Sequence, residues 1–312
     1  MDPQEDRTAS LMTPAKLAKV AGSGPAAVAP SQFLDRMAAD EGHQHLHRLG
    51  ELRLALQAHG QGELEQAEQA ASVLEHMRDA MPQVDFAPLQ DRNWWADITG
   101  KSRTRGSAFA STFDRVDEVA QELGTAVAAL QKRQLQRATA QDRTLVEFNV
   151  EYQALDKAIH QGSRWLQDMR NQVKARQAQA GSAEAEQQVR ADEARCELLV
   201  ERLKLLRAAA AASHGAYEEV LATAQRRSEF AQATGRVASV HLQSWRSSLS
   251  AVASAASGGK VSEPLLEEAQ KAHAKLCRKL EALLADAGQL RTHETALVAQ
   301  LAAMGEQLAA VA

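Results

Sequence analysis

Apolar residues recur at alternating spacings of three and four residues in three runs that cover most of the chain after residue 145. The first run extends from Leu145 to Val173, the second from Val189 to Ala224, and the third from Ala269 to Val311. A sustained three-four spacing turns one face of a helix toward a partner helix, as in left-handed coiled coils. We call such a face a seam. The first seam comprises Leu145, Phe148, Tyr152, Leu155, Ile159, Gly162, Leu166, Met169 and Val173.

The breaks between the seams are short and rich in glycine and serine, at 179–182 and 257–262. Short connections make sequential helices antiparallel neighbours. Pro264 suits the first turn of the last helix. Gly215 and Gly235 are positions where the middle helix could bend, and polar residues 131–144 could interrupt the first helix. The predicted long helices span 108–178, 184–256 and 263–311.

The first third of the chain carries weaker patterns. Ser31 is a good N-cap, and a helix that starts there is expected to break at Gly60 and Gly62 and to be followed by a second helix that ends at Pro82. The predicted organisation is a disordered tail at 1–30, a short helical pair at 31–82, an irregular hinge at 83–107 and a long-helix bundle at 108–312. The predicted fold class is therefore all-α: an elongated antiparallel bundle of long coiled-coil-like helices with a small N-terminal helical pair.

Composition narrows the class of protein. Aromatic residues are only 4%, and Pro264 is the only proline after Pro88, which favours long helices over sheets. The net charge of −4 gives no global basic bias, so nucleic acid is not an expected partner. The chain starts with acidic residues, where a signal peptide would be basic. The longest uncharged run, Ser247 to Gly259, is well short of the ~20 apolar residues that cross a bilayer. We therefore expect a cytoplasmic protein.

The candidate cofactor and metal motifs are weak. Thr99 to Ser102 reads TGKS, but Trp95 stands where a phosphate-binding loop needs glycine, so a simple loop is favoured. His43 and His47 share a helix face at a spacing that can bind zinc, yet only Asp40 and Glu41 lie near enough to complete a site. Solvent-facing histidines are the favoured interpretation. No cofactor and no metal are predicted.

The two cysteines are expected to be separate structural thiols. Cys196 lies on the second seam and Cys277 beside the third. In antiparallel helices that turn near Gly259, the two α-carbons would lie far beyond the ~7 Å that a disulfide allows. No catalytic residue is predicted.

A small basic cluster next to two tryptophans is the candidate contact site. Cations beside aromatic rings suit a protein partner, an anion or a membrane surface, but the same residues would also suit a hinge packed on the end of the bundle. The residues are Trp94, Trp95, Lys101, Arg103 and Arg105.

One arrangement resembles a known family. The run NWWADITGKSRTRGSAF precedes a helix with FNVEYQALDKAIHQGSRWL, so that a tryptophan and Gly100-Lys101 are followed by Tyr152, Leu155, Ile159 and Gly162. This order resembles the TelA-like toxic anion resistance family over about residues 90 to 311. The resemblance implies an intracellular all-helical protein linked to tolerance of tellurite and to envelope stress.

Three functions are weighed. The first is a stress-resistance scaffold of this family, which would bind protein partners. The second is a generic coiled-coil scaffold or assembly protein unrelated to anion resistance, for which self-association is the expected behaviour. The third is a metal- or thiol-dependent enzyme that detoxifies oxyanions, which would depend on the histidines and on Cys196 and Cys277. We favour a non-catalytic protein.

Overall fold

The computed structural model describes residues 42–90, 101–179, 181–258 and 261–311. Within these ranges the chain forms helices and no strand, so the predicted all-α bundle is confirmed. The elements in chain order are α3 (His43–Ala80), the 3₁₀ turn η1 (Met81–Gln83), α4 (Ala87–Gln90), α6 (Lys101–Gln179), α7 (Ala183–Arg236), the π-helical segment η2 (Val237–Leu242), α8 (Gln243–Ser257) and α9 (Glu263–Val311).

The chain divides into two compact units, and α6 and α7 contribute to both. The bundle unit comprises the described residues within 45–155 and 208–311. The hairpin unit comprises the described residues within 42–44 and 156–207. Each unit is described by itself below.

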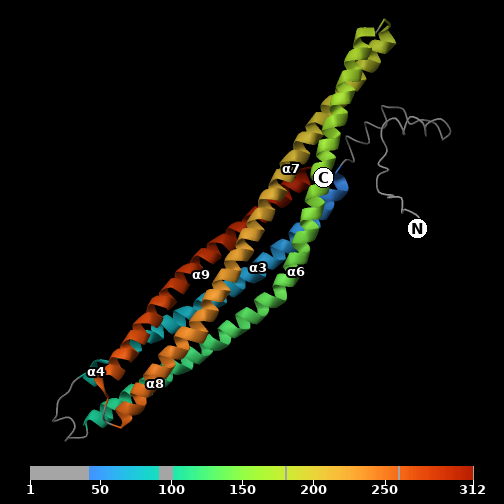
Figure 1. Ribbon diagram of the computed structural model, residues 1–312. Coiled ribbons are helices and arrows are strands. Elements are labelled where there is room, and N and C mark those ends of the chain that lie inside the picture. The colour runs from blue at the N-terminus through green and yellow to red at the C-terminus, as the bar shows by residue number, and fades with distance from the viewer. Residues whose placement is uncertain (1–41, 91–100, 180, 259–260, 312) are drawn as a thin grey trace, which may run out of the picture. The chain divides into compact units, whose positions relative to one another are not determined.

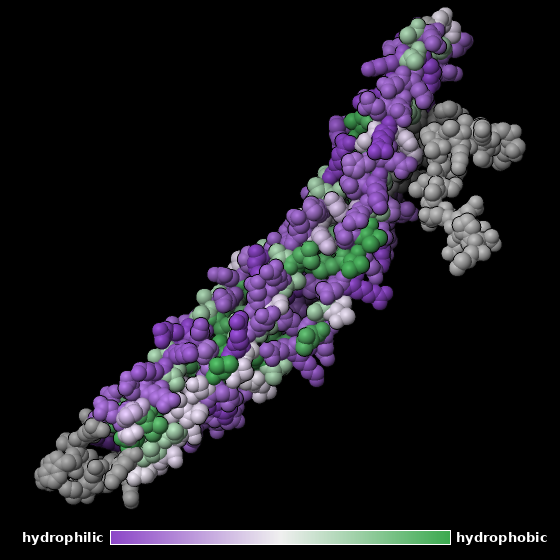
Figure 2. All heavy atoms as spheres, in the orientation of Figure 1, coloured by the Kyte–Doolittle hydropathy of each residue, from purple (hydrophilic) through white to green (hydrophobic). Residues whose placement is uncertain are grey.

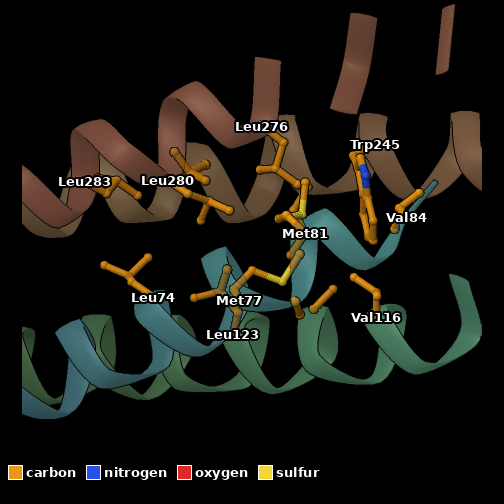
Figure 3. Close-up of a cluster of buried hydrophobic side chains, with 14 of the residues drawn as sticks. Leu74, Met77, Met81, Val84, Val116, Leu123, Trp245, Leu276, Leu280 and Leu283 are labelled. Atoms are coloured by element: carbon orange, nitrogen blue, oxygen red, sulfur yellow. The ribbon is translucent and has the colours of Figure 1, made fainter. Parts of the chain in front are cut away.

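The bundle unit packs four helical segments side by side. They are α3, the first part of α6, the continuous α7–η2–α8 segment and α9, and helices that follow one another in the chain run in opposite directions (Figure 1). Figure 3 shows how side chains from α3, α6, α8 and α9 meet in one core. Each fully buried Leu or Met side chain stabilises the fold by roughly 1.5–3 kcal/mol. The labelled core residues are Leu74, Met77, Met81, Val84, Val116, Leu123, Trp245, Leu276, Leu280 and Leu283.

The hairpin unit is a helical hairpin made by the end of α6 and the start of α7. Val173 of α6 packs with Val189 and Cys196 of α7, and Leu166 and Met169 lie against them. The seam alternation predicted for this region therefore holds. At the start of α7 the backbone N–H of Ala185 donates to Ser182 Oγ at 3.2 Å, which caps the helix where the sequence predicted a break.

The predicted helical pair at 31–82 is wrong in one respect, because α3 is a single helix through Gly60 and Gly62. Gly60 lies on the buried face, and a Cβ there would stand 3.3 Å from Cγ2 of Val298 in α9. Glycine in a helix interior costs about 1 kcal/mol of stability relative to alanine. Burial of Leu56 before Gly60 and of Ala67 after it offsets this cost. Residues 31–41 lie outside the described residues, as does the predicted tail at 1–30.

Two further boundaries differ from the prediction. Helix α6 begins at Lys101, inside the predicted hinge at 83–107, and it continues without a break through polar residues 131–144. Those polar residues are mostly exposed, while Gln141 is buried in the core. In the third predicted helix the bounds agree, since α9 spans Glu263–Val311 with Pro264 in its first turn.

The segment η2 is a π-helical insertion in an otherwise α-helical run. Upstream of it, buried residues follow at three-four steps through Phe230, Thr234 and Val237. The next buried residue is Leu242, five positions on, after which the three-four steps resume at Trp245. A π turn accommodates one extra residue in a helix. The insertion therefore keeps the residues on both sides of η2 in the same core.

The glycines of α6 provide the first test of this packing. A Cβ on Gly106 would stand 2.1 Å from the backbone oxygen of Ala256, so α6 and α8 would have to separate. We expect Gly106→Ala to lower the free energy of unfolding by about 1–3 kcal/mol. A Cβ on Gly124 meets nothing within 4 Å, so Gly124→Ala should raise it by up to about 1 kcal/mol. Urea unfolding of both variants checks this, and stabilisation by both would contradict the close α6–α8 contact.

Candidate functional site

The basic cluster predicted from the sequence falls mostly outside the described residues. Trp94 and Trp95 lie in the undescribed segment 91–100. Lys101 and Arg103 belong to the first turn of α6, but their side chains are not among those described. Arg105 is half-buried. The proposed contact site around these five residues therefore remains a prediction.

The histidine patch does not form a metal site in the described part of the chain. His43 and His47 are both exposed, and His47 Nδ1 lies 3.6 Å from Glu51 of its own helix. His45 Nδ1 lies 2.8 Å from Glu151 Oε2 and so links α3 to α6. Among the described residues no group of three His, Cys, Asp or Glu side chains could hold a metal ion.

The two cysteines are free and lie in different units. Burial raises the pKa of the Cys196 thiol, with the nearby Arg170 acting in the opposite direction. Burial also raises the pKa of the Cys277 thiol, and Glu281 adds to the effect. Because the thiolate is the reactive form, both groups are poor nucleophiles at neutral pH.

The most distinctive chemistry in the bundle unit is a polar layer inside its core. Arg227 of α7, Glu294 of α9 and Gln141 of α6 form it, with exposed fractions of 8%, 0% and 7%. Arg227 Nη2 donates to Glu294 Oε2 at 2.7 Å, and Nε donates to Oε1. Nη1 donates to Gln141 Oε1 at 2.9 Å. The guanidinium is thus bound on three sides, and the pair is bidentate, which is the strong geometry for arginine and carboxylate.

A cleft of about 470 Å³ opens beside this layer, between α6 and α7. Its walls carry several amides, and its one further arginine, Arg137, donates to Glu63 of α3 at 3.2 Å. On the α3 side Gln66 is 6% exposed, and its Nε2 donates to the Gly62 carbonyl at 3.3 Å. Ser228 and the carboxylates of Asp142 and Glu63 also line this cleft. The layer is suited to fixing the register of the three helices that contribute to it.

A second polar contact, which is partly buried, lies among aromatic rings near the start of α9. Trp245 Nε1 donates to His273 Nδ1 at 3.2 Å, and the Phe86 ring meets the imidazole edge-on at 5.5 Å between centroids. Indole nitrogen is a donor only, so Nδ1 must be the acceptor and the proton of the neutral ring is on Nε2. Burial lowers the pKa of His273, since the charged ring would lose solvation.

No protein-family model, no curated protein and no solved structure matches this chain. The resemblance to the TelA-like family therefore remains a prediction from the sequence.

Sequence reasoning found one member of the polar layer without recognising its role. Glu294 stands in the third seam, whose other members apart from His273 are all apolar. A charged residue in a seam indicates either a buried pair or a break in the seam. Arg227 lies three residues beyond Ala224, where the second seam was predicted to end, and its buried neighbours Thr223 and Phe230 continue the spacing. Gln141 gave no signal, because residues 131–144 are mostly polar and no apolar periodicity marks one face there.

The polar layer predicts a strongly asymmetric mutational response. Glu294→Ala leaves the Arg227 guanidinium buried without its carboxylate, which should cost about 3–5 kcal/mol of stability. The double variant Arg227→Met/Glu294→Leu removes both charges and should be clearly more stable than the single variant. Urea unfolding measures both. As a control, Arg143→Ala breaks an exposed pair with Glu147 and should change stability by less than about 1 kcal/mol. Equal losses in the single and double variants would contradict a functional pairing of these two side chains.

The lowered pKa of His273 predicts that the stability of the folded protein depends on pH. Its pKa in the folded state lies below the ordinary value of 6.5, so the unfolded chain binds the proton more tightly. This contribution to stability is complete above that ordinary value and is lost as the pH falls toward the folded-state pKa. His273→Gln keeps an acceptor for Trp245 but does not titrate. The difference in melting temperature between wild type and variant, followed from pH 8 to pH 5, should therefore shrink as the pH falls, and a difference independent of pH would contradict the assignment.

Proposed function

We propose that this chain is a non-catalytic helical scaffold that acts in the cytoplasm in tolerance of toxic anions such as tellurite. The observation that supports a scaffold is the way polar groups are used in the bundle core. Arg227 pairs with both Glu294 and Gln141, and the two thiols have raised pKa values. The anion-resistance part rests on the resemblance carried by Gly100-Lys101 and by the Tyr152 to Gly162 arrangement.

A scaffold acts through its outer surfaces, and the described helices leave apolar side chains on them. Val146 and Val150 of α6 are 64% and 58% exposed and stand one helical turn apart. Figure 2 shows a group of hydrophobic side chains over α6 near the middle of its length, within a largely hydrophilic face. In the described part of the chain no helix has the length and apolar character needed to cross a membrane. The partners in this proposal are proteins, with contact at a membrane surface as a further role for the basic cluster.

A second candidate is a coiled-coil scaffold for an assembly unrelated to anion resistance. It is favoured by the long seams of α6, α7 and α9, which by themselves specify packing and no particular stress. The two candidates differ in what the cell loses when the gene is deleted.

The experiment that separates them is deletion of the gene followed by complementation. We expect the deletion strain to become several-fold more sensitive to tellurite, and wild type to restore tolerance. The variant Trp94→Ala/Trp95→Ala/Arg103→Ala/Arg105→Ala should stay helical by circular dichroism, fail to restore tolerance and lose partners that wild type captures.

Unchanged sensitivity to tellurite and to envelope stress would contradict the anion-resistance role and favour the second candidate. Reduction of tellurite by the purified protein, abolished in Cys196→Ser/Cys277→Ser, would contradict the non-catalytic proposal. The matched control for the four-alanine variant is Arg143→Ala/Arg190→Ala, which removes two strongly exposed arginines elsewhere.

A further inference from the structure

The stretch of α6 that precedes the polar layer has a second cleft, on the side that faces α3. This cleft has a volume of about 440 Å³, which is within the range of small-molecule sites. It belongs to the bundle unit, and Thr234 of α7 contributes to its lining. We call it the α3–α6 cleft. Its apolar lining includes Ala70, Val73, Leu74, Ala126, Val127 and Leu130.

The cleft is present because short side chains face each other across the two helices. Leu74 of α3 and Leu123 of α6, each 2% exposed, belong to the core at one end of the cleft (Figure 3). On the next turns Ala70 and Ala126 leave room that longer aliphatic side chains would fill, and Leu130 is only partly buried. An apolar ligand in the cleft would cover this surface. Each methylene group that it buries strengthens binding roughly four-fold.

The cleft has one polar end and one apolar end. Arg137 of α6 donates to Glu63 of α3 at 3.2 Å, which fixes how these two antiparallel helices are aligned. In this alignment Gln66 of α3 and Arg133 of α6 share the end of the cleft near the polar layer. The two core leucines lie at the opposite end.

Arg133 supplies a cation at the polar end. Among the described residues that line the cleft it is the one that carries a charge, and it is exposed. Its guanidinium makes no hydrogen bond or ion pair with another described residue. Arginine binds carboxylates through two parallel hydrogen bonds. A carboxylate at this end of the cleft would meet no acidic side chain in the lining.

Gln66 supplies a buried acceptor at the same end. The residue is 6% exposed, and its Nε2 donates to the Gly62 carbonyl at 3.3 Å. Its Oε1 is buried and accepts no hydrogen bond from the described part of the chain. A buried acceptor without a donor is costly. A ligand that fits this end therefore carries a hydrogen-bond donor beside its carboxylate.

We propose that the α3–α6 cleft binds an aliphatic hydroxy acid of medium chain length. The carboxylate accepts from the Arg133 guanidinium, and the neighbouring hydroxyl group donates to Gln66 Oε1. The chain lies between Ala70 and Ala126 and points toward Leu74. From position 66 to position 74 α3 rises by about 12 Å, which is close to the length of an extended ten-carbon acid. The proposal goes beyond the scaffold function and does not depend on a role in anion tolerance.

The first test is titration calorimetry of the full-length protein with 3-hydroxydecanoate, below the concentration at which this acid forms micelles. We expect saturable binding at one site, with a Kd below about 100 μM. Decanoate, which lacks the hydroxyl group, should bind several-fold more weakly. The short acid 3-hydroxybutyrate keeps the polar groups but lacks most of the chain, and it should bind at least about 100-fold more weakly.

The second test uses variants of the lining, each first shown by circular dichroism to keep the wild-type helicity. Arg133→Gln should weaken binding of both ten-carbon acids at least about ten-fold. Lys132→Gln is the matched control, because Lys132 is an exposed cation next in the chain that does not line the cleft, and it should bind as wild type does. Ala126→Leu should weaken binding of both acids by filling the cleft. Gln66→Leu should bind decanoate and 3-hydroxydecanoate equally.

Four results would overturn the proposal. They are the absence of saturable binding of 3-hydroxydecanoate up to about 1 mM, unchanged affinity in Arg133→Gln, unchanged affinity in Ala126→Leu, and equal affinity of the wild type for the two ten-carbon acids. The last result would mean that the hydroxyl group does not reach Gln66 and that water serves as its donor. None of these results bears on tellurite sensitivity, so the failure of this inference and the failure of the proposed function can be told apart.

Discussion

The fold depends on burial of one aliphatic face along each long helix. Helices of this composition gain little stability in isolation, and most of what holds them comes from packing an apolar face against neighbours. In α9 that face is buried from Ala269 to Val311, with His273 half-buried. The core is only a few side chains wide, and aromatic rings concentrate at one end around Trp245 and Phe86. A seam of similar leucines could still slide by a turn unless something fixes its register.

The polar layer supplies that constraint. A shift of α9 by one turn would withdraw Glu294 from Arg227 and leave a buried charge unpaired, which costs several kcal/mol. A slide between apolar side chains carries no such penalty. The layer also includes Gln141 of α6, so hydrogen bonds to the single Arg227 side chain connect three of the four helices. The buried Arg227–Glu294 pair therefore favours one arrangement of the helices over others that would bury the same leucines.

Much of the fold followed from the sequence, because a seam encodes both the helix and its buried face. The bounds of α9 were predicted to the residue, and Leu145, Phe148 and Leu155 are buried as expected. The break expected at Gly60 was wrong, since glycine reads as a helix stop unless the close approach of Val298 is known. The close approach of Val298 to Gly60 depends on the tertiary structure and is not encoded in the local sequence. Apolar or small residues at steps of three, four or seven from Leu46 through Gly60 to Met77 were the available signal for a continuous α3.

The functional surfaces were much harder to predict than the fold. The tryptophan and arginine cluster was selected by residue type alone, and four of its five side chains lie outside what the structure describes. Arg227 was missed because an arginine in a helix ordinarily belongs to the solvent face. The exposure of Leu198 was missed for a related reason, since a leucine in a helix ordinarily belongs to the buried face, and Leu198 is 63% exposed.

The π-helical segment η2 has a consequence for how the chain can change length. A one-residue insertion in a regular helix would rotate everything downstream by about 100° and turn Leu249 and Val252 out of the core. In η2 the extra residue is absorbed within Val237–Leu242, so the aromatic end of the bundle keeps its orientation. This segment is the natural place for relatives of the chain to gain or lose single residues. A homologue one residue shorter here would be expected to have an ordinary α-helix and the same core.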